Sequence, residues 1–447
     1  MKRWGLRLAV AAALGVAVVV VVASIDRCGG PWPARAPWVR ATGHDTGPMR
    51  AGAAAVPLSI HYPTTVAGYA PWRPTAERAA APLMARASVV EVGTQRVTLV
   101  TLDTLLVTAK MQRAVQEGQK GPVWLIATHT HTSVGGYDSR PVAEVAALGW
   151  YDERIEADLV EAARSAVTKA VAALEPARLE IGQSEVQGLT VPRSGDEVEH
   201  TLTVVRFVGA RPIAQWLIFS AHPTVATPQA ALLDPDWPGR LAELTSEQVS
   251  LVLQGAGGNA TVDRAFAATP AEFAAHLLEH VSVPQTQLVG VELAWAEVGL
   301  ALPHPEGSRL VREAEVGLAL PSPESSRLVG EALLGPIESA LCWGQEREAM
   351  VAMLRLGPAA FLFTTVEPSA PAGRVLEGAA RADRVIGLAN GYHGYLEPEE
   401  AARAAQGESK RQYFPPSFVG VLGQAASLAA ASLGPSARPA PRLEMEP

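Results

Sequence analysis

Cysteine and charged residues are scarce in this chain. Only two of its 447 residues are cysteine, Cys28 and Cys342, so the sequence predicts no disulfide framework. Charged residues make up 18% of the chain, and the formal net charge is −8. Phosphate backbones require basic surface, and no lysine- or arginine-rich tract occurs, which argues against a nucleic-acid partner. Hydrophobic residues reach 48%, enough for a sizeable core.

The amino terminus carries a long unbroken run of small and apolar residues. Residues 1–7 are cationic, and Leu8 to Ile25 are all small or apolar. This pattern predicts a signal peptide or a membrane anchor over residues 1–28. The run is just long enough to span a bilayer, which favours the anchor. The rest of the chain is then exported: anchored at a membrane and facing the periplasm or the outside, or else secreted.

Three further segments follow. Residues 29–42 contain three prolines and read as a linker. Residues 43–434 form the predicted folded domain, and the proline-rich tail 435–447 is predicted to be disordered. Within the domain, residues 297–331 hold a tandem duplication with an 18-residue period, too short for a solenoid.

Apolar runs and helical stretches are interleaved along the domain. The runs at 97–102, 202–207 and 249–253 have the length of buried strands, and 155–174 has the periodicity of a surface helix. This mixture predicts an α/β, or α+β layered, fold in which mixed β-sheets are flanked by helices.

Histidines follow two of the apolar runs. Val123–Ile126 leads into a turn that contains His129 and His131, and Ile213–Phe219 leads into His222. Neutral imidazole is the commonest metal ligand, and zinc is its usual partner. Strand alternation would point two histidines at i and i+2 to opposite faces unless the backbone turns between them. Local spacing alone leaves a metal site and ordinary surface histidines as alternatives, and the second strand end favours the metal site.

Several segments occur in an order that resembles the neutral, non-lysosomal ceramidase family. They are 43–48, 68–70, 127–137, 193–194, 202–207, 221–224, 236–239 and 389–395. No single motif is specific, but their joint order is, and it extends over residues 40–425. The resemblance implies a ceramidase-like catalytic domain for residues 43–434.

The resemblance also implies a chemistry. Such enzymes use one zinc ion per chain to cleave the N-acyl amide bond of ceramide, so the expected partner is a lipid-like small molecule. His129, His222 and Tyr395 match metal ligands of the family. His131 and Arg193 match residues that orient the substrate oxygen. The oligomeric state stays open.

Two departures from the family pattern affect that chemistry. Gln254 stands where the nucleophilic serine is expected, and its amide could donate to an oxyanion or simply cap a turn. The expected glutamate ligand falls on Phe361 or Leu362, with Glu367 available only if the chain shifts locally. Without the serine, zinc-bound water is the expected nucleophile. The alternative is a catalytically inactive metal- or lipid-binding relative.

A rival metal motif and two acidic residues need separate interpretation. His276, Glu279 and His280 fit the inverted-zincin peptidase pattern, which a solvated helix also explains. Asp103 and Asp236 are candidate acceptors for the second nitrogen of a ligand imidazole.

Overall fold

The computed structural model describes residues 35–68, 74–195, 197–227, 230–245, 248–281, 286–288, 290–305, 342 and 344–434. The predicted segment 1–28, most of the duplication at 297–331 and the tail 435–447 lie outside these ranges. In the described part of the chain, no helix is both long enough and apolar enough to cross a bilayer.

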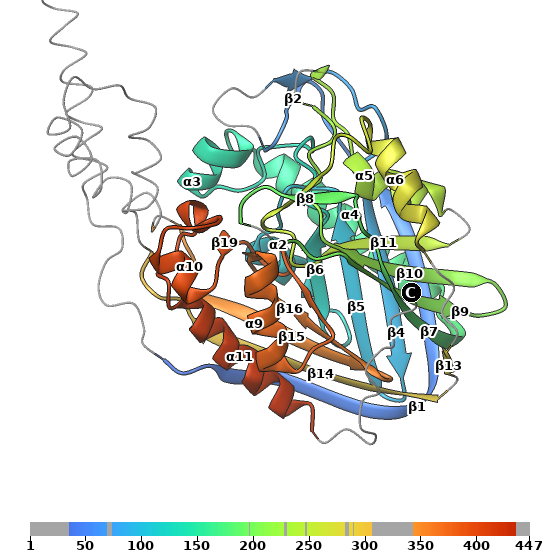
Figure 1. The fold of residues 1–447 in the computed structure, drawn as a ribbon. Helices are drawn as coiled ribbons and strands as arrows, with labels where there is room; N and C mark the ends of the chain where they lie inside the picture. Colours follow the sequence, from blue (N-terminus) through green and yellow to red (C-terminus); the bar gives the residue numbers. More distant parts are fainter. Residues whose placement is uncertain are drawn as a thin grey trace, which may run out of the picture.

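A single long strand, β1 (Trp38–Pro57), joins the two parts of the sheet (Figure 1). Its first half pairs antiparallel with β14 (Gly290–Ala301), and its second half pairs with β4 (Met84–Val92) and briefly with β7 (Glu175–Glu185). Residues 38–42 are therefore strand, and the predicted linker ends before Trp38 rather than at residue 42.

The sheet continues outward from β1 in three directions. Its remaining strands are β5 (Gln95–Leu102), β6 (Val123–Ala127), β9 (Thr201–Val208), β10 (Pro212–Phe219), β11 (Val249–Gln254), β13 (Thr286–Leu288), β15 (Glu348–Leu356), β16 (Ala359–Phe363) and β18 (Arg384–Ile386). The pairs β5–β6, β10–β11 and β16–β18 are parallel, whereas the other neighbours are antiparallel. The predicted mixed sheet is thus confirmed.

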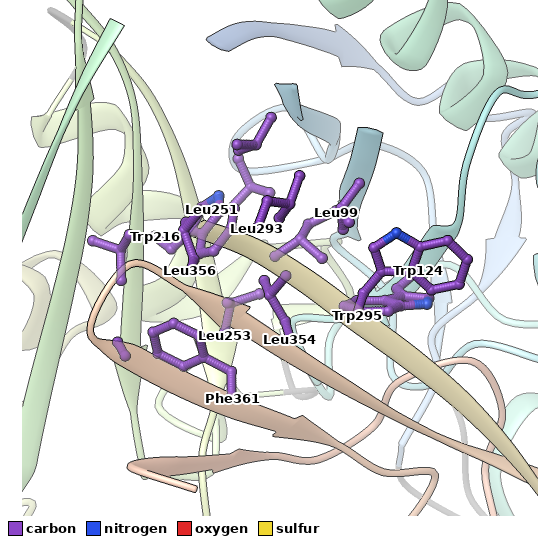
Figure 2. Close-up of a cluster of buried hydrophobic side chains, with 14 of the residues drawn as sticks. Leu99, Trp124, Trp216, Leu251, Leu253, Leu293, Trp295, Leu354, Leu356 and Phe361 are labelled. Atoms are coloured by element: carbon purple, nitrogen blue, oxygen red, sulfur yellow. The ribbon is translucent and has the colours of Figure 1, made fainter. Parts of the chain in front are cut away.

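The inner faces of the sheet meet in an apolar core (Figure 2). Figure 2 labels ten of its side chains: Leu99, Trp124, Trp216, Leu251, Leu253, Leu293, Trp295, Leu354, Leu356 and Phe361. They come from all three branches of the sheet, so the core locks the strands that carry the candidate site against one another. Burying such apolar surface contributes about 25 cal/mol per Å².

Helices cover the outer faces of the sheet. They are α2 (Ala109–Gln116), α4 (Glu153–Ala172), α5 (Asp236–Leu244), α6 (Pro270–Glu279), α9 (Ala370–Ala380) and α11 (Phe418–Ser432). The predicted helix 155–174 corresponds to α4. Asp152 caps its first turn by accepting from the amide of Arg154, and its alanine-rich face packs against β1 and β4. The layered arrangement of helices and sheet is therefore as predicted.

Short elements fill the edges. They are β2 (Thr64–Thr65), β3 (Thr75–Ala76), α3 (Pro141–Ala143), the π-helix η1 (Glu144–Leu148), β8 (Thr190–Pro192), β12 (Ala260–Val262), β17 (Glu367–Pro368), β19 (Tyr395–Leu396), α10 (Glu399–Arg403) and the 3-10 helix η3 (Ser409–Arg411).

One expectation about cysteine fails. Cys342 is disulfide-bonded, although the scarcity of cysteine predicted no disulfide framework. The other cysteine of the sequence lies outside the described residues. A single pair of distant cysteines has no spacing pattern from which a bond could be predicted.

Candidate metal centre

His129 lies two residues beyond the end of β6, in a left-handed backbone conformation with φ of 70°. This conformation is uncommon for a residue other than glycine and marks a sharp turn. The turn brings the rings of His129 and His131 together, with 4.9 Å between their centroids. The backbone therefore breaks the strand alternation that would have separated the two imidazoles.

His222 reaches the same place from β10. Its ring centroid lies 4.9 Å from that of His129 and 5.7 Å from that of His131. Ligating nitrogens of these three histidines all lie within 4.8 Å of one another. The two strand ends singled out in the sequence thus converge.

Backbone carbonyls orient the two strand-end imidazoles. The Nδ1 atom of His129 lies 2.7 Å from the carbonyl oxygen of Leu105, and Nδ1 of His222 lies 2.9 Å from that of Gly257. Since a carbonyl can only accept, Nδ1 carries the proton in each ring, and the lone pair of Nε2 is left for a metal. Carbonyls thus take the role considered for Asp103 and Asp236. Asp103 instead binds Arg86, and Asp236 accepts backbone amides.

Two oxygen donors come from a small parallel ladder near the carboxyl terminus. Residues Glu367 of β17 and Tyr395 of β19 are directly paired in this ladder. The Oε2 atom of Glu367 lies 3.0 Å from Nε2 of His129 and 3.2 Å from Nε2 of His222. The hydroxyl of Tyr395 lies 3.0 Å from Nε2 of His222.

Four of the six separations among these four donors match those of atoms that bind one metal ion. The two Nε2 atoms are 3.3 Å apart, so the measured separations span 3.0–3.3 Å. A tetrahedron with zinc–ligand bonds of about 2.0–2.1 Å has edges of roughly 3.3–3.4 Å. In addition, Oε2 of Glu367 is buried and accepts no hydrogen bond within the described residues. The donor set therefore fits zinc.

Tyr392 holds the carboxylate of Glu367 from the other side. Its hydroxyl donates to Oε1 of Glu367 over 2.5 Å, which leaves Oε2 facing the histidines. Outer partners of this kind fix the orientation of a metal ligand. Sequence reasoning assigned no role to Tyr392, although it lies in one of the segments that resemble the family.

Arg193 approaches the cluster beside Tyr395. It follows β8, and its Nη2 donates to the hydroxyl of Tyr395 over 3.1 Å and to the carbonyl of Gly258 over 2.8 Å. Its Nε atom pairs with Glu408 at 3.1 Å. The structure thus brings all three predicted ligands, His131 and Arg193 into one site.

Burial dominates the electrostatics of the cluster. It lowers the pKa of His222, and it lowers that of His131 well below the ordinary value. Burial raises the pKa of the Tyr395 hydroxyl, and the charge of Glu367 raises it further. Burial alone would also raise the pKa of Glu367, but the adjacent rings of His129 and His222 hold it well below its usual range. His131 and His222 are thus neutral and Glu367 is charged at neutral pH.

The chain is similar in sequence to one known protein family. The family model described as neutral/alkaline non-lysosomal ceramidase, N-terminal, matches residues 61–270. The resemblance to that family is confirmed. The matched part contains His129, His131, Arg193 and His222, whereas Glu367 and Tyr395 lie beyond it.

Two solved structures resemble this fold. A neutral ceramidase from Pseudomonas aeruginosa is 19% identical, with a TM-score of 0.69 over 89% of this chain and 77% of that one. A ceramidase complexed with C2 is 18% identical, with a TM-score of 0.70 over 89% of this chain and 78% of the other. No curated protein matches the chain in sequence. At such identity the two structures establish the ceramidase-like fold.

The position of the carboxylate differs from the sequence interpretation. Phe361 and Leu362, where the glutamate was expected, are buried in β16 and face the hydrophobic core. β16 ends at Phe363, and the chain then needs a few more residues to reach the histidines, so Glu367 occupies the site instead. The local shift considered as an alternative is the one that the structure adopts.

The side chain of Gln254 is hydrogen-bonded to the backbone at both ends of its amide group. Its Nε2 donates to the carbonyl of Thr128 over 3.1 Å, and its Oε1 accepts from the amide of Ala221 at 3.5 Å. It therefore links the chain after β6 to the chain after β10, beside the two histidines. This geometry favours the structural alternative over oxyanion stabilisation.

Glycines line the small cavity beside the donors. The cavity measures about 10 Å³, and Gly255, Gly257 and Gly258 are among the residues that line it with the histidines and Glu367. A cavity of about 10–15 Å³ holds a single water molecule. A side chain at Gly255 would meet Oγ of Ser220 at 2.5 Å. Gly255 therefore has no room for a side chain without rearrangement.

The remaining predicted positions lie elsewhere. Residues 43–48 are in the middle of β1, where Asp45 binds the backbone and side chain of Thr94. The side chains of His276 and Glu279 are exposed on α6. Among the described residues, only the group of His129, His131 and His222 has the clustering of a metal site. The inverted-zincin alternative therefore has no structural support.

Proposed function

We propose that this chain is a zinc-dependent hydrolase that cleaves the N-acyl amide bond of a ceramide-like lipid. The observation that carries the proposal is the set of four donors at 3.0–3.3 Å, contributed by His129, His222, Glu367 and Tyr395. Retention of the anionic Glu367 supports firm zinc binding, because two imidazoles and a phenol alone would leave the charge of the ion uncompensated.

The other residues of the site position the substrate. Arg193 donates to the Tyr395 hydroxyl, and we assign it with His131 to the orientation of the substrate carbonyl oxygen. When bound, zinc would polarise that carbonyl and activate a water molecule. Gln254 keeps the strand ends in register rather than acting on the substrate.

Water is the proposed nucleophile because the turn 254–259 contains no serine. Attack of water on the amide carbon and departure of the amine give a fatty acid and a free amine. An acyl-enzyme route would need a side-chain nucleophile at this turn. The absence of that side chain also supports a second candidate, a catalytically inactive metal- or lipid-binding relative.

The amino-terminal run supports a membrane location for this chemistry. We propose that residues 1–28 anchor the chain, or direct its secretion, so that the domain faces the periplasm or the outside. A lipid-like substrate in a bilayer would then lie within reach of the domain.

Zinc content and turnover of the full chain in mild detergent test the proposal. The wild type should bind one zinc per chain and hydrolyse a fluorescent ceramide analogue. His129→Ala should lose both properties, and His276→Ala, which alters an exposed histidine of the rival motif, should keep both. Zinc binding without turnover of any amide or ester would support the inactive relative. Loss of zinc only in His276→Ala would contradict the assigned site.

A further inference from the structure

A second arginine lies beside the metal centre. Arg411, in η3, has its guanidinium carbon 5.9 Å from the centroid of the Tyr395 ring, and that of Arg193 is 5.4 Å from the same centroid. Tyr395 is one of the four proposed ligands, so both guanidiniums are adjacent to the metal centre. The resemblance to the family assigns no function to Arg411.

One buried carboxylate holds the two arginines together. Oε1 of Glu408 lies 3.1 Å from Nε of Arg193, and its Oε2 accepts from Nη1 of Arg411. Ser194 also donates to Oε1 of Glu408, over 2.6 Å. The side chain of Glu408 is only 4% exposed, whereas those of Arg193 and Arg411 are 28% and 47% exposed. The buried carboxylate of Glu408 thus holds the two arginine side chains in place, and both guanidiniums are partly exposed to solvent.

Two guanidiniums share one ion-paired carboxylate at this place, although the chain as a whole carries a net charge of −8. Glu397, whose Oε1 accepts from the backbone amide of Glu408, is the next carboxyl group. Within the described residues, Nη1 of Arg193 and both Nε and Nη2 of Arg411 have no hydrogen-bonded acceptor. A zinc ion opposite Glu367 would add a further net positive charge. Guanidinium N–H groups suit the planar geometry of a carboxylate.

We propose that Arg411 and Arg193 form an anion-recognition pair that binds a carboxylate attached to an acyl chain. The inference rests on the proposed function for the acyl chain, and on the geometry around Glu408 for the carboxylate. Two sources share this chemistry: the fatty acid that hydrolysis releases, and an N-acyl substrate that itself carries a carboxylate. Arg411 is then a specificity-determining residue, since its guanidinium lies over the ring of Tyr395 and makes no hydrogen bond to the hydroxyl of Tyr395 or to another donor atom among the described residues.

Calorimetric titration of the zinc-supplied full chain with octanoate and with octanamide tests the pair. The two probes have the same chain length, and only octanoate is charged. The wild type should prefer octanoate. Arg411→Gln should weaken octanoate binding about tenfold, the scale of one charge-assisted hydrogen bond, and leave octanamide binding unchanged. Arg411→Lys should keep part of the preference, which separates loss of charge from loss of packing.

Arg403→Gln is the matched control, because Arg403 is an exposed arginine on the neighbouring α10 that pairs with Glu399. It should behave as the wild type, and 0.5 M salt should reduce the octanoate preference of both. Equal binding of the two probes by the wild type would overturn the proposal, as would no detectable binding of octanoate or an equal loss for both probes in Arg411→Gln.

Hydrolysis of N-octanoylglycine and N-octanoylethanolamine identifies the source of the carboxylate. Faster cleavage of the glycine conjugate, lost in Arg411→Gln, would place the carboxylate on the substrate. Equal cleavage with Arg411-dependent inhibition by octanoate would assign it to the product. An octanoate preference without turnover of either amide would overturn the proposed function and leave the anion pair standing.

Discussion

The two halves of the metal centre are built in different ways. His129 and His222 follow strands of five and eight residues that are embedded in the main sheet. Glu367 and Tyr395 sit on a ladder of two residues each, β17 and β19. Donors from the two halves lie 3.0–3.2 Å apart, but only the histidines directly follow strands of the main sheet to within three residues. A donor can therefore be placed accurately by an element too short to have a sequence pattern of its own.

The orientation of the donors differs as well. Each histidine is fixed by a backbone carbonyl, which persists when side chains change. Glu367 is fixed by the side-chain hydroxyl of Tyr392. Point mutation should therefore impair the orientation of the oxygen half more readily, whereas the histidine half should be impaired mainly by loss of a ligand itself.

Loss of a histidine ligand should have the largest effect. In His222→Ala, zinc retention should be abolished, and turnover should fall by about a thousandfold or more, because the metal contributes several kcal/mol to the transition state. Zinc analysis of the dialysed protein and initial rates measure the two effects. Retention of one zinc per chain in this variant would remove His222 from the ligand set.

Replacement of the carboxylate comes next. Glu367→Gln removes the one anionic donor, so zinc affinity should fall by more than about 100-fold, beyond the range of outer-shell partners. Competition with a chromophoric chelator measures this affinity. Leu362→Glu is the contrasting variant. It should unfold the chain at lower temperature because it buries a charge in the core, and it should not rescue zinc binding in Glu367→Gln. If Leu362→Glu restored zinc binding in Glu367→Gln, position 362 and not position 367 would be the place of the metal-binding carboxylate.

A smaller loss is expected for the residue behind the carboxylate. Tyr392→Phe removes the hydroxyl that orients Glu367 and leaves all four donors, so zinc affinity should fall about 10–100-fold. Tyr62→Phe, at a half-exposed tyrosine, is the control and should change nothing. The same chelator assay applies, and an unchanged affinity in Tyr392→Phe would mean that the backbone alone orients Glu367.

Asp236 should affect stability without affecting zinc. Burial raises the pKa of this carboxyl from its ordinary 3.8 to about 7. The folded chain therefore holds a proton that the unfolded chain releases, so the contribution of Asp236 is complete below about pH 4 and is lost as the pH rises towards 7. In Asp236→Asn this decline in the free energy of unfolding should vanish. Denaturant titrations at pH 4, 5.5 and 7 compare the slopes, and parallel slopes would contradict the raised pKa.

The sequence predicted the sheet better than it predicted the site. The strands 97–102, 202–207 and 249–253 and the helix 155–174 agree with β5, β9, β11 and α4 to within two residues, because buried runs and amphipathic faces are local patterns. The start of β1 was missed because the linker was predicted from three prolines that all precede Trp38. His129 and His222 were found from strand ends.

Glu367 and Tyr392 were harder to assign for a physical reason. Their roles depend on the pairing of β17 with β19 and on one hydroxyl–carboxylate contact, both between residues more than 20 positions apart. The segment Phe-Leu-Phe-Thr-Thr at 361–365 resembles the family, so the glutamate was expected at Phe361 or Leu362. Both residues lie in β16, and their apolar side chains belong to the core. A buried carboxylate just after that strand, in Glu367-Pro368-Ser369, was the available signal.

X-ray absorption at the zinc edge of the reconstituted full chain tests the central claim most directly. The four protein donors and the bound water of the proposed function predict four to five nitrogen or oxygen neighbours at about 2.0–2.1 Å, two of them with the outer-shell scattering of imidazole. In Glu367→Gln one oxygen neighbour should be lost or replaced. A six-coordinate spectrum without imidazole scattering, or a wild type that takes up no zinc, would contradict the account.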